Sequence, residues 1–145
     1  MFVKDLDKMN GITVGITDHA PPPFDLERKA LGPNAKIIFL NSRFEEDFDP
    51  KILRKLDALL VWRAGISEHT VRYLDRCKIV VRYGVGYDAI DFKSLKEHGI
   101  PFCNVPDYGT EEVADSTCAM LLGLHRKIIY YDNLSRNLYD NWQNQ

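Results

Sequence analysis

Apolar runs of four to six residues recur through the first three quarters of the chain, separated by polar and amphipathic stretches. The run from Ile79 to Val81 contains only β-branched residues, which is typical of a strand buried on both faces of a sheet. The five runs predict strands at residues 12–17, 36–40, 58–62, 78–81 and 101–105.

The stretches between these runs predict short helices, because capping residues mark where the helices begin and end. Asp49, Ser67 and Asp91 are placed to cap helix starts, and Gly32 and Gly99 to end helices. The expected helices are 24–31, 50–56, 68–76 and 92–98. This alternation predicts an α/β domain with a flavodoxin-like parallel sheet of five strands, ordered 2-1-3-4-5, and helices on both faces.

Residues 110–145 differ in kind, because they lack strand runs. We expect one long helix, capped by Thr110, with Glu111 and Glu112 in its first turn. Its apolar positions are Val113, Met120, Leu121, Leu124, Ile128, Ile129, Tyr130, Tyr131, Leu134, Leu138 and Trp142. So much apolar surface needs a cover, which predicts a homodimer that associates through residues 124–142.

Length and composition indicate an ordinary globular protein with one core. The 145 residues are 45% hydrophobic and carry a formal net charge of −2, which gives no electrostatic reason to expect a nucleic acid or membrane partner. No apolar run reaches a membrane span and the N-terminus lacks a signal-peptide pattern, so we expect a cytoplasmic protein. Cys77, Cys103 and Cys118 lack paired spacing and predict buried free thiols. The four histidines lack metal-ligand spacing, so no metal site is expected.

A glycine-rich loop follows the fourth predicted strand. Gly84-Val85-Gly86-Tyr87-Asp88-Ala89 fits G-x-G-x-x-[G/A], with Asp107 about 20 residues further on, and so mimics a dinucleotide fingerprint. In that fingerprint a helix opens within the glycine loop and faces the pyrophosphate, whereas the best capping residue here is Asp91, beyond the loop. A tight strand exit without a ligand role is a further alternative.

Two motifs, RYGVGYDAID at 82–91 and GIPFCNVPDYGTEEVADST at 99–117, resemble the D-isomer-specific 2-hydroxyacid dehydrogenases. That family includes phosphoglycerate dehydrogenase, formate dehydrogenase and the C-terminal binding protein corepressors. The likeness covers nearly the whole chain. Ala89 departs from the family, which usually has asparagine there to brace the loop by a side-chain hydrogen bond.

The resemblance implies a substrate-binding domain over residues 1–109, followed at 110–145 by a linking helix and dimerisation arm. It implies that the active-site cleft is lined by the glycine loop and holds a small 2-hydroxy or 2-keto acid. The residues expected to bind this substrate are Arg82, Gly84, Val85, Gly86, Arg63 and Gly109, and Thr117 is expected near the nicotinamide. The alternatives are surface arginines paired with acids such as Asp88, and a threonine bonded back to its own helix.

Family members continue into a nucleotide-binding domain that carries a second glycine motif and the catalytic arginine, glutamate and histidine. Since the sequence stops at Gln145, we expect no catalytic residue in it and no NAD bound to it alone, although the intact enzyme would use NAD. Two interpretations stay open: part of an NAD-dependent D-2-hydroxyacid dehydrogenase, shortened and inactive alone, or a non-enzymatic binding or dimerisation module. A phosphoacceptor receiver or a flavodoxin is disfavoured, because Asp18 stands alone after the first strand and no phosphate loop follows it.

Overall fold

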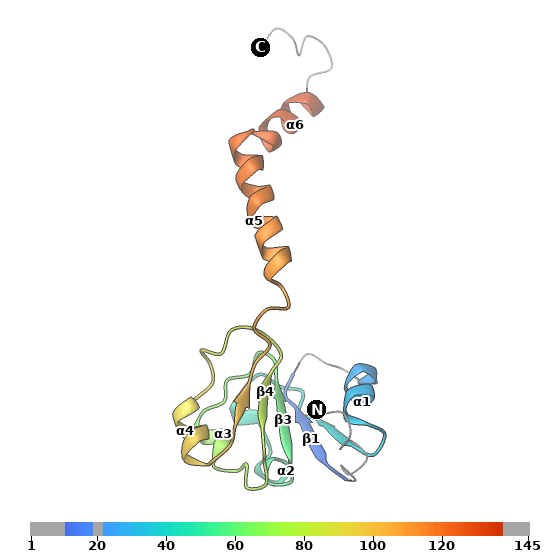
Figure 1. The fold of residues 1–145 in the computed structure, drawn as a ribbon, viewed down its shortest axis with the longest axis vertical. Helices are drawn as coiled ribbons and strands as arrows, with labels where there is room; N and C mark the ends of the chain where they lie inside the picture. Colours follow the sequence, from blue (N-terminus) through green and yellow to red (C-terminus); the bar gives the residue numbers. More distant parts are fainter. Residues whose placement is uncertain (1–10, 19–21, 138–145) are drawn as a thin grey trace. The chain divides into compact units, whose positions relative to one another are not determined.

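The computed structural model describes residues 11–18 and 22–137, and divides the chain into two compact units, Met1–Pro106 and Asp107–Gln145. The first unit holds five parallel strands in the order β2-β1-β3-β4-β5, which confirms the predicted sheet (Figure 1). The strands are β1 (Thr13–Ile16), β2 (Lys36–Phe39), β3 (Ala58–Val61), β4 (Val80–Arg82) and β5 (Phe102–Cys103). Both edge strands are short, and Pro101 and Pro106 flank β5.

Short helices connect the strands. They are α1 (Asp25–Leu31), the 3-10 helix η2 (Glu45–Asp47), α2 (Pro50–Leu53), α3 (Glu68–Val71) and α4 (Phe92–Glu97). The side chains of Asp49, Ser67 and Asp91 accept hydrogen bonds from main-chain N–H groups in the first turns of α2, α3 and α4, as the sequence predicts. Gly99 ends α4 with a left-handed φ of 67°. The predicted helix 68–76 is too long, because α3 ends at Val71 and is followed by i→i+3 turns that turn Leu74 into the core.

The main core lies on the face of the sheet that α2, α3 and α4 cover. Leu53, Leu59, Val71, Val80 and Leu95 are each at most 1% exposed there. At Gly15 a Cβ atom would lie only 2.5 Å from Cδ1 of buried Leu56, so this position on β1 has no room for a side chain. Phe24, beside α1, instead packs edge-to-face on Phe39 of β2 with ring centroids 5.7 Å apart. Since Phe39 and Ile38 are neighbours on a strand and Ile38 packs on the main core, α1 covers the opposite face.

Asp57 ties the start of β3 to the start of β1. Its carboxylate accepts the Thr13 N–H at 2.8 Å and pairs with the Arg76 guanidinium at 2.9 Å. The hydrogen bond from Thr13 is the main cause that lowers the pKa of Asp57, although burial opposes it, and Arg76 and Lys78 lower the pKa further.

We expect Asp57→Asn to flatten the acid limb of the stability curve. A carboxyl group whose pKa is lowered by folding stabilises the fold above its ordinary pKa, about 3.9, and loses that contribution as the pH falls through the lowered value. The variant should therefore be about 1 kcal/mol less stable at pH 6, and the difference should begin to narrow below about pH 4. Urea unfolding at pH 3 to 6 measures this; a gap that is constant with pH would contradict it.

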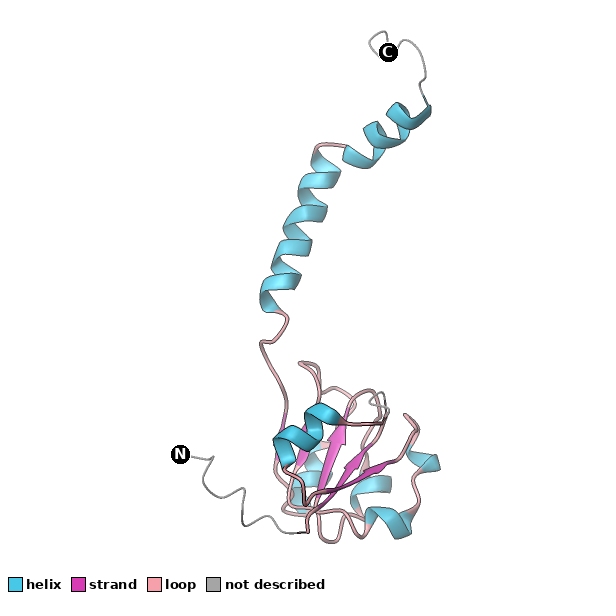
Figure 2. Ribbon diagram, turned by 90° about the vertical axis from the view of Figure 1, so that its right-hand side faces the viewer, coloured by secondary structure: helices cyan, strands magenta, loops and turns pink. Residues whose placement is uncertain are grey.

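The second unit contains α5 (Thr110–His125) and α6 (Ile128–Asn137), which Figure 2 shows as separate helices. The prediction of one continuous helix is wrong, because Lys127 has a φ of 53° and left-handed backbone cannot continue an α-helix. The prediction that Thr110 caps the helix is also wrong: Gly109 is the N-cap and makes no side-chain hydrogen bond. Among the described residues, no helix combines the length and apolar character that a membrane crossing requires.

Within this unit the apolar side chains of α5 and α6 lie open. The exposed fractions are 75% for Leu124, 72% for Ile129 and 60% for Tyr130, and neither helix buries a residue. Leu138 and Trp142, which the sequence placed on the same apolar face, lie outside the described residues. The prediction of an uncovered apolar surface is confirmed for the part of the tail that the structure describes.

The three cysteines are free, as expected, but they differ in burial. Cys77 is buried in the main core, and that burial raises the pKa of its thiol. Cys103 and Cys118 are exposed, so the prediction of buried thiols is wrong for these two. Cys103 lies on β5, which is an edge strand of the sheet that the described residues form.

Candidate functional site

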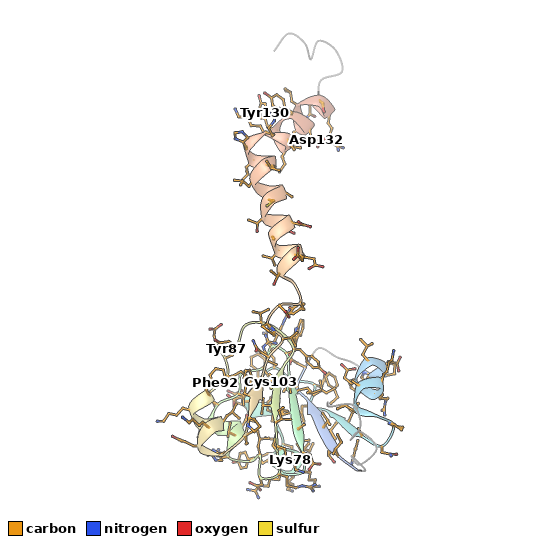
Figure 3. The ribbon with its side chains drawn as sticks, in the orientation of Figure 1. Lys78, Tyr87, Phe92, Cys103, Tyr130 and Asp132 are labelled. Atoms are coloured by element: carbon orange, nitrogen blue, oxygen red, sulfur yellow. The ribbon has the colours of Figure 1, made fainter. Side chains whose placement is uncertain are left out.

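The carboxyl ends of β3 and β4 bring two arginines together. Arg82 ends β4 and pairs in register with Val61 at the end of β3, two residues before Arg63. A cavity of about 190 Å³ opens there, which we call the carboxyl-edge hollow. It is lined by Trp62, Arg63, Ala64, Arg82, Gly86, Tyr87, Asp88, Ala89 and Ile90. In Figure 3, Tyr87 lies towards this end of the sheet and Lys78, which precedes β4, lies at the other.

The Arg82 side chain is half-buried and folds back over the glycine loop. Its Nη1 donates to the Tyr83 carbonyl at 3.4 Å, and a Cβ atom on Gly84 would lie 3.4 Å from the same nitrogen. Within the described ranges, no carboxylate forms an ion pair with Arg82, not even Asp88 in the same hollow. The guanidinium therefore keeps hydrogen-bonding capacity for a ligand at this edge.

Arg63 is more exposed, and an aromatic ring holds its side chain. Its guanidinium carbon lies 4.2 Å from the centre of the Trp62 ring, a cation–π contact. Trp62 and Arg63 form the exit of β3, so the loop that carries Arg63 is set by the strand before it. Arg63 and Arg82 thus reach the hollow from neighbouring strands, as the order of the strands in the sheet requires.

The glycine loop is braced by main-chain hydrogen bonds on both sides. The Gly84 carbonyl accepts the Val105 N–H at 3.2 Å, and the Asn104 side chain donates to the Val85 carbonyl at 2.9 Å. Ile66 donates its N–H to the Ala89 carbonyl at 2.9 Å. A main-chain contact therefore braces the loop at Ala89, where the resembling family usually has an asparagine side chain.

The loop does not have the geometry of a dinucleotide fingerprint. The next helix, α4, begins at Phe92 and is capped by Asp91, so no helix opens within Gly84–Ala89. Tyr87 and Phe92 instead pack edge-to-face with ring centroids 5.2 Å apart, a contact whose two partners are labelled in Figure 3. A pyrophosphate would find no helix N-terminus at this loop.

The remaining expected site residues are Gly84, Val85, Gly109 and Thr117. Gly84 and Val85 adjoin it in sequence but do not line it, and Val85 is 48% exposed. Gly109 and Thr117 belong to the second unit. The Thr117 hydroxyl donates to the Val113 carbonyl at 2.7 Å, which is the alternative of a threonine bonded back to its own helix.

Two carboxylates, one buried and one half-buried, hold the segment after β3, and no sequence pattern indicated either role. Asp18, directly after β1, accepts hydrogen bonds from the main chain of Trp62 and Arg63. Glu45 of η2 accepts the Ser67 N–H at 2.8 Å and the Thr70 hydroxyl at 2.6 Å. Their partners lie 22 to 45 residues away, a separation over which no local pattern operates.

A tyrosine and a glutamate link α1 to the exit of β4. The Tyr83 hydroxyl donates to Glu27 Oε1 at 3.1 Å. Burial, followed by the nearby negative charge of Glu27, raises the pKa of Tyr83 well above its usual range, so this hydroxyl keeps its proton at neutral pH.

No cluster of three metal-ligating side chains occurs within residues 11–18 and 22–137.

Two named relatives share sequence with the chain. C-terminal-binding protein 1 of Caenorhabditis elegans is 29% identical over 107 residues, covering 73% of this chain and 15% of the relative. A protein of Staphylococcus epidermidis that carries the name 2-hydroxyacid dehydrogenase is 28% identical over 123 residues, covering 76% of this chain and 39% of its own length.

Solved structures share the fold. The 2-hydroxyacid dehydrogenase of Ketogulonicigenium vulgare is 25% identical with a TM-score of 0.70, covering 88% of this chain and 40% of that one. D-lactate dehydrogenase of Aquifex aeolicus, solved with NAD and lactic acid, is 24% identical with a TM-score of 0.70, covering 88% and 38%. The chain thus spans about two fifths of the length of these structures.

The sequence model of one family matches residues 16–141, which is most of the chain. Its description is D-isomer specific 2-hydroxyacid dehydrogenase, catalytic domain. The chain therefore belongs to the D-isomer specific 2-hydroxyacid dehydrogenase family and contains its catalytic, substrate-binding domain.

Proposed function

We propose that the chain supplies the substrate-binding part of an NAD- or NADP-dependent dehydrogenase, and that the carboxyl-edge hollow binds the carboxylate of a small 2-hydroxy or 2-keto acid. The observation that carries this proposal is the pair of arginines, Arg82 and Arg63, that line one small cavity beside Gly86. A planar guanidinium matches a carboxylate through two parallel hydrogen bonds. The lactic acid in the Aquifex aeolicus enzyme is an acid of the proposed class.

Arg82 is the principal ligand in this proposal, because it is half-buried and has no ion-pair partner in the described part of the chain. The main-chain N–H group of Gly86, which lines the hollow, supplies a weaker contact to the acid, and Gly84 and Val85 stand next to it in the same loop. Arg63 adds a second positive charge from the neighbouring strand.

A titration with pyruvate tests this assignment. The NMR signals of the Gly84 and Gly86 amides report the binding. We expect saturable shifts with a dissociation constant near 1 mM, about 4 kcal/mol, since an open and hydrated site offsets the charge contacts with desolvation and association entropy. If the amide signals do not shift on addition of pyruvate, the carboxylate does not bind at this edge of the sheet.

The glycine loop does not fit a nucleotide pyrophosphate. Gly84–Ala89 has no helix N-terminus, and the Thr117 hydroxyl already donates within α5. The nicotinamide cofactor that the proposed reaction needs would supply or accept the hydride, and residues other than these would hold its phosphates.

We expect the 145-residue chain to bind NAD more weakly than micromolar and to oxidise no 2-hydroxy acid. The reason is the geometry of the glycine loop, which lacks the dipole and N–H groups that anchor a pyrophosphate. Isothermal calorimetry with NAD and an absorbance assay for NADH measure the two expectations. Micromolar affinity would identify Gly84–Ala89 as a nucleotide loop after all.

Residues 110–145, which make up most of the second unit, fit the role of a linking helix and dimerisation arm after a substrate-binding domain over residues 1–109. The support for this role is the uncovered apolar surface of α5 and α6, which a second copy of the same surface would bury. This surface also favours a second candidate function, a non-enzymatic binding or dimerisation module. A reading frame that continues past codon 145 into a second G-x-G-x-x-G unit would favour the enzyme.

Truncation after Lys127 should make the chain more monomeric. The shortened chain loses α6, with Ile129, Tyr130 and Tyr131, each at least 58% exposed. Sedimentation velocity of the full and shortened chains at equal concentration measures the change, with the Ser135→Ala variant of the full chain as a control that leaves the apolar side chains in place. A full chain that sediments as a monomer would contradict association through this segment.

A further inference from the structure

Asp18 makes an unusual set of contacts for a carboxylate at the end of a buried strand. Its Oδ1 accepts the N–H groups of Trp62 at 3.3 Å and Arg63 at 3.1 Å, and its Oδ2 accepts the Arg63 N–H at 3.0 Å. The Thr17 hydroxyl also donates to Oδ1. The residue is only 9% exposed, and it does not line the carboxyl-edge hollow.

The two residues that Asp18 holds both line the hollow. Both carboxylate oxygens of Asp18 accept the main-chain N–H of Arg63. The Arg63 guanidinium lies against the Trp62 ring. Hydrogen bonds to an ionised acceptor are stronger and shorter than neutral ones, so the Asp18 contact restrains the loop more than an ordinary turn would.

We propose that Asp18 is a positioning residue for the anion site: its carboxylate fixes the Trp62–Arg63 main chain, and thereby keeps the Arg63 guanidinium at the hollow. The inference rests on the proposed function of that hollow as a carboxylate site. Asp18 does not contact the bound acid and affects its binding only through Arg63.

The direction in which pyruvate affinity changes when Asp18 is removed shows whether Asp18 acts by positioning Arg63 or by its negative charge. A buried negative charge close to an anion site repels the anion, so removal of Asp18 would raise pyruvate affinity if charge were its only influence. Removal lowers the affinity if Asp18 acts by holding Arg63. The two accounts predict opposite changes from the same variant.

The experiment compares the full chain with Asp18→Ala, Arg63→Ala and the double variant, each titrated with pyruvate and followed on the Gly84 and Gly86 amides. We expect each single variant to bind about threefold more weakly, and the double variant no more weakly than Arg63→Ala, because residues that act through one another are not additive. Higher affinity in Asp18→Ala, or losses that multiply in the double variant, would overturn the proposal.

A second readout needs no ligand. The Trp62 ring lies against the Arg63 guanidinium and shields its side-chain protons, so their NMR shifts report its position. Asp18→Ala should move these signals towards unstructured values, and unchanged signals would refute the positioning role. If the wild-type chain binds no pyruvate while these signals still depend on Asp18, the proposed function fails and the positioning role stands.

The chain offers a matched control in Asp57→Ala. Asp57 also accepts a main-chain N–H between β1 and β3, but at the opposite ends of both strands. The Asp57→Ala variant should have a lower free energy of unfolding, with pyruvate affinity and the NMR signals of the Arg63 side chain unchanged. If Asp18→Ala does not fold, Asp18→Asn keeps one oxygen and removes the same charge, and a smaller loss of the same sign is expected; a gain would again overturn the proposal.

Discussion

Arg82→Ala is expected to abolish measurable pyruvate binding, raising the dissociation constant from about 1 mM to beyond 10 mM. The variant removes a charge-assisted, bidentate contact, and such contacts contribute about 1.5–3 kcal/mol, or roughly tenfold to a hundredfold in affinity. Because the starting affinity is only about 4 kcal/mol, this loss takes the complex out of the range that the titration can follow.

Arg82→Lys separates the charge from the shape of the group. Lysine keeps the positive charge but presents no planar fork, so it should recover only part of the affinity. Arg54→Ala is the matched control, since it removes one exposed arginine that pairs with Asp75 and does not line the hollow. Equal shifts of the Gly84 and Gly86 signals in the wild type and Arg82→Ala would make Arg82 a structural surface residue.

Leu59→Ala should produce the largest loss of stability, about 3 kcal/mol in the free energy of unfolding. Leu59 is fully buried on β3, the middle strand, and its Cδ1 would lie 3.2 Å from a Cβ atom on Gly15 of the neighbouring strand. Truncation there removes apolar contacts and leaves a cavity in rigid surroundings, for which losses of about 2–5 kcal/mol are typical.

Urea unfolding measures this loss against Leu26→Ala. Leu26 lies in α1 and is 80% exposed, so the same chemical change should cost less than about 0.5 kcal/mol. The comparison tests the sheet directly: similar losses in the two variants would mean that β3 does not pass through the centre of the core.

The features that the sequence predicted correctly are those encoded by neighbouring residues. Asp49, Ser67 and Asp91 cap helices because a short polar side chain reaches the N–H two or three residues later. Strand order follows from the alternation of strands and helices with short right-handed connections. Arg63 and Arg82 could be placed together for the same reason, since both follow strands that are adjacent in the sheet.

The features that escaped prediction depend on conformations or contacts that leave no local pattern. The break between α5 and α6 falls at Lys127, and neither it nor its two neighbours is a glycine or proline that would have predicted a helix end. The hydrogen bonds that Asp18 accepts from distant residues come from main-chain N–H groups, which nearly every residue carries, so its partners at Trp62 and Arg63 could not be predicted from side-chain identity. Such contacts become visible only when the two strand ends are set side by side.

The short edges of the sheet affect how readily a strand of another molecule could add to it. In the part of the sheet that the structure describes, β5 is an edge strand of two residues, Phe102 and Cys103, and the prolines at 101 and 106 have no N–H to donate to an incoming strand. The opposite edge, β2, is four residues long and begins with Lys36, a charge that disfavours strand addition. Neither border is a good template for cross-β growth, so copies of this chain that meet in solution should associate through helices and keep their sheets separate.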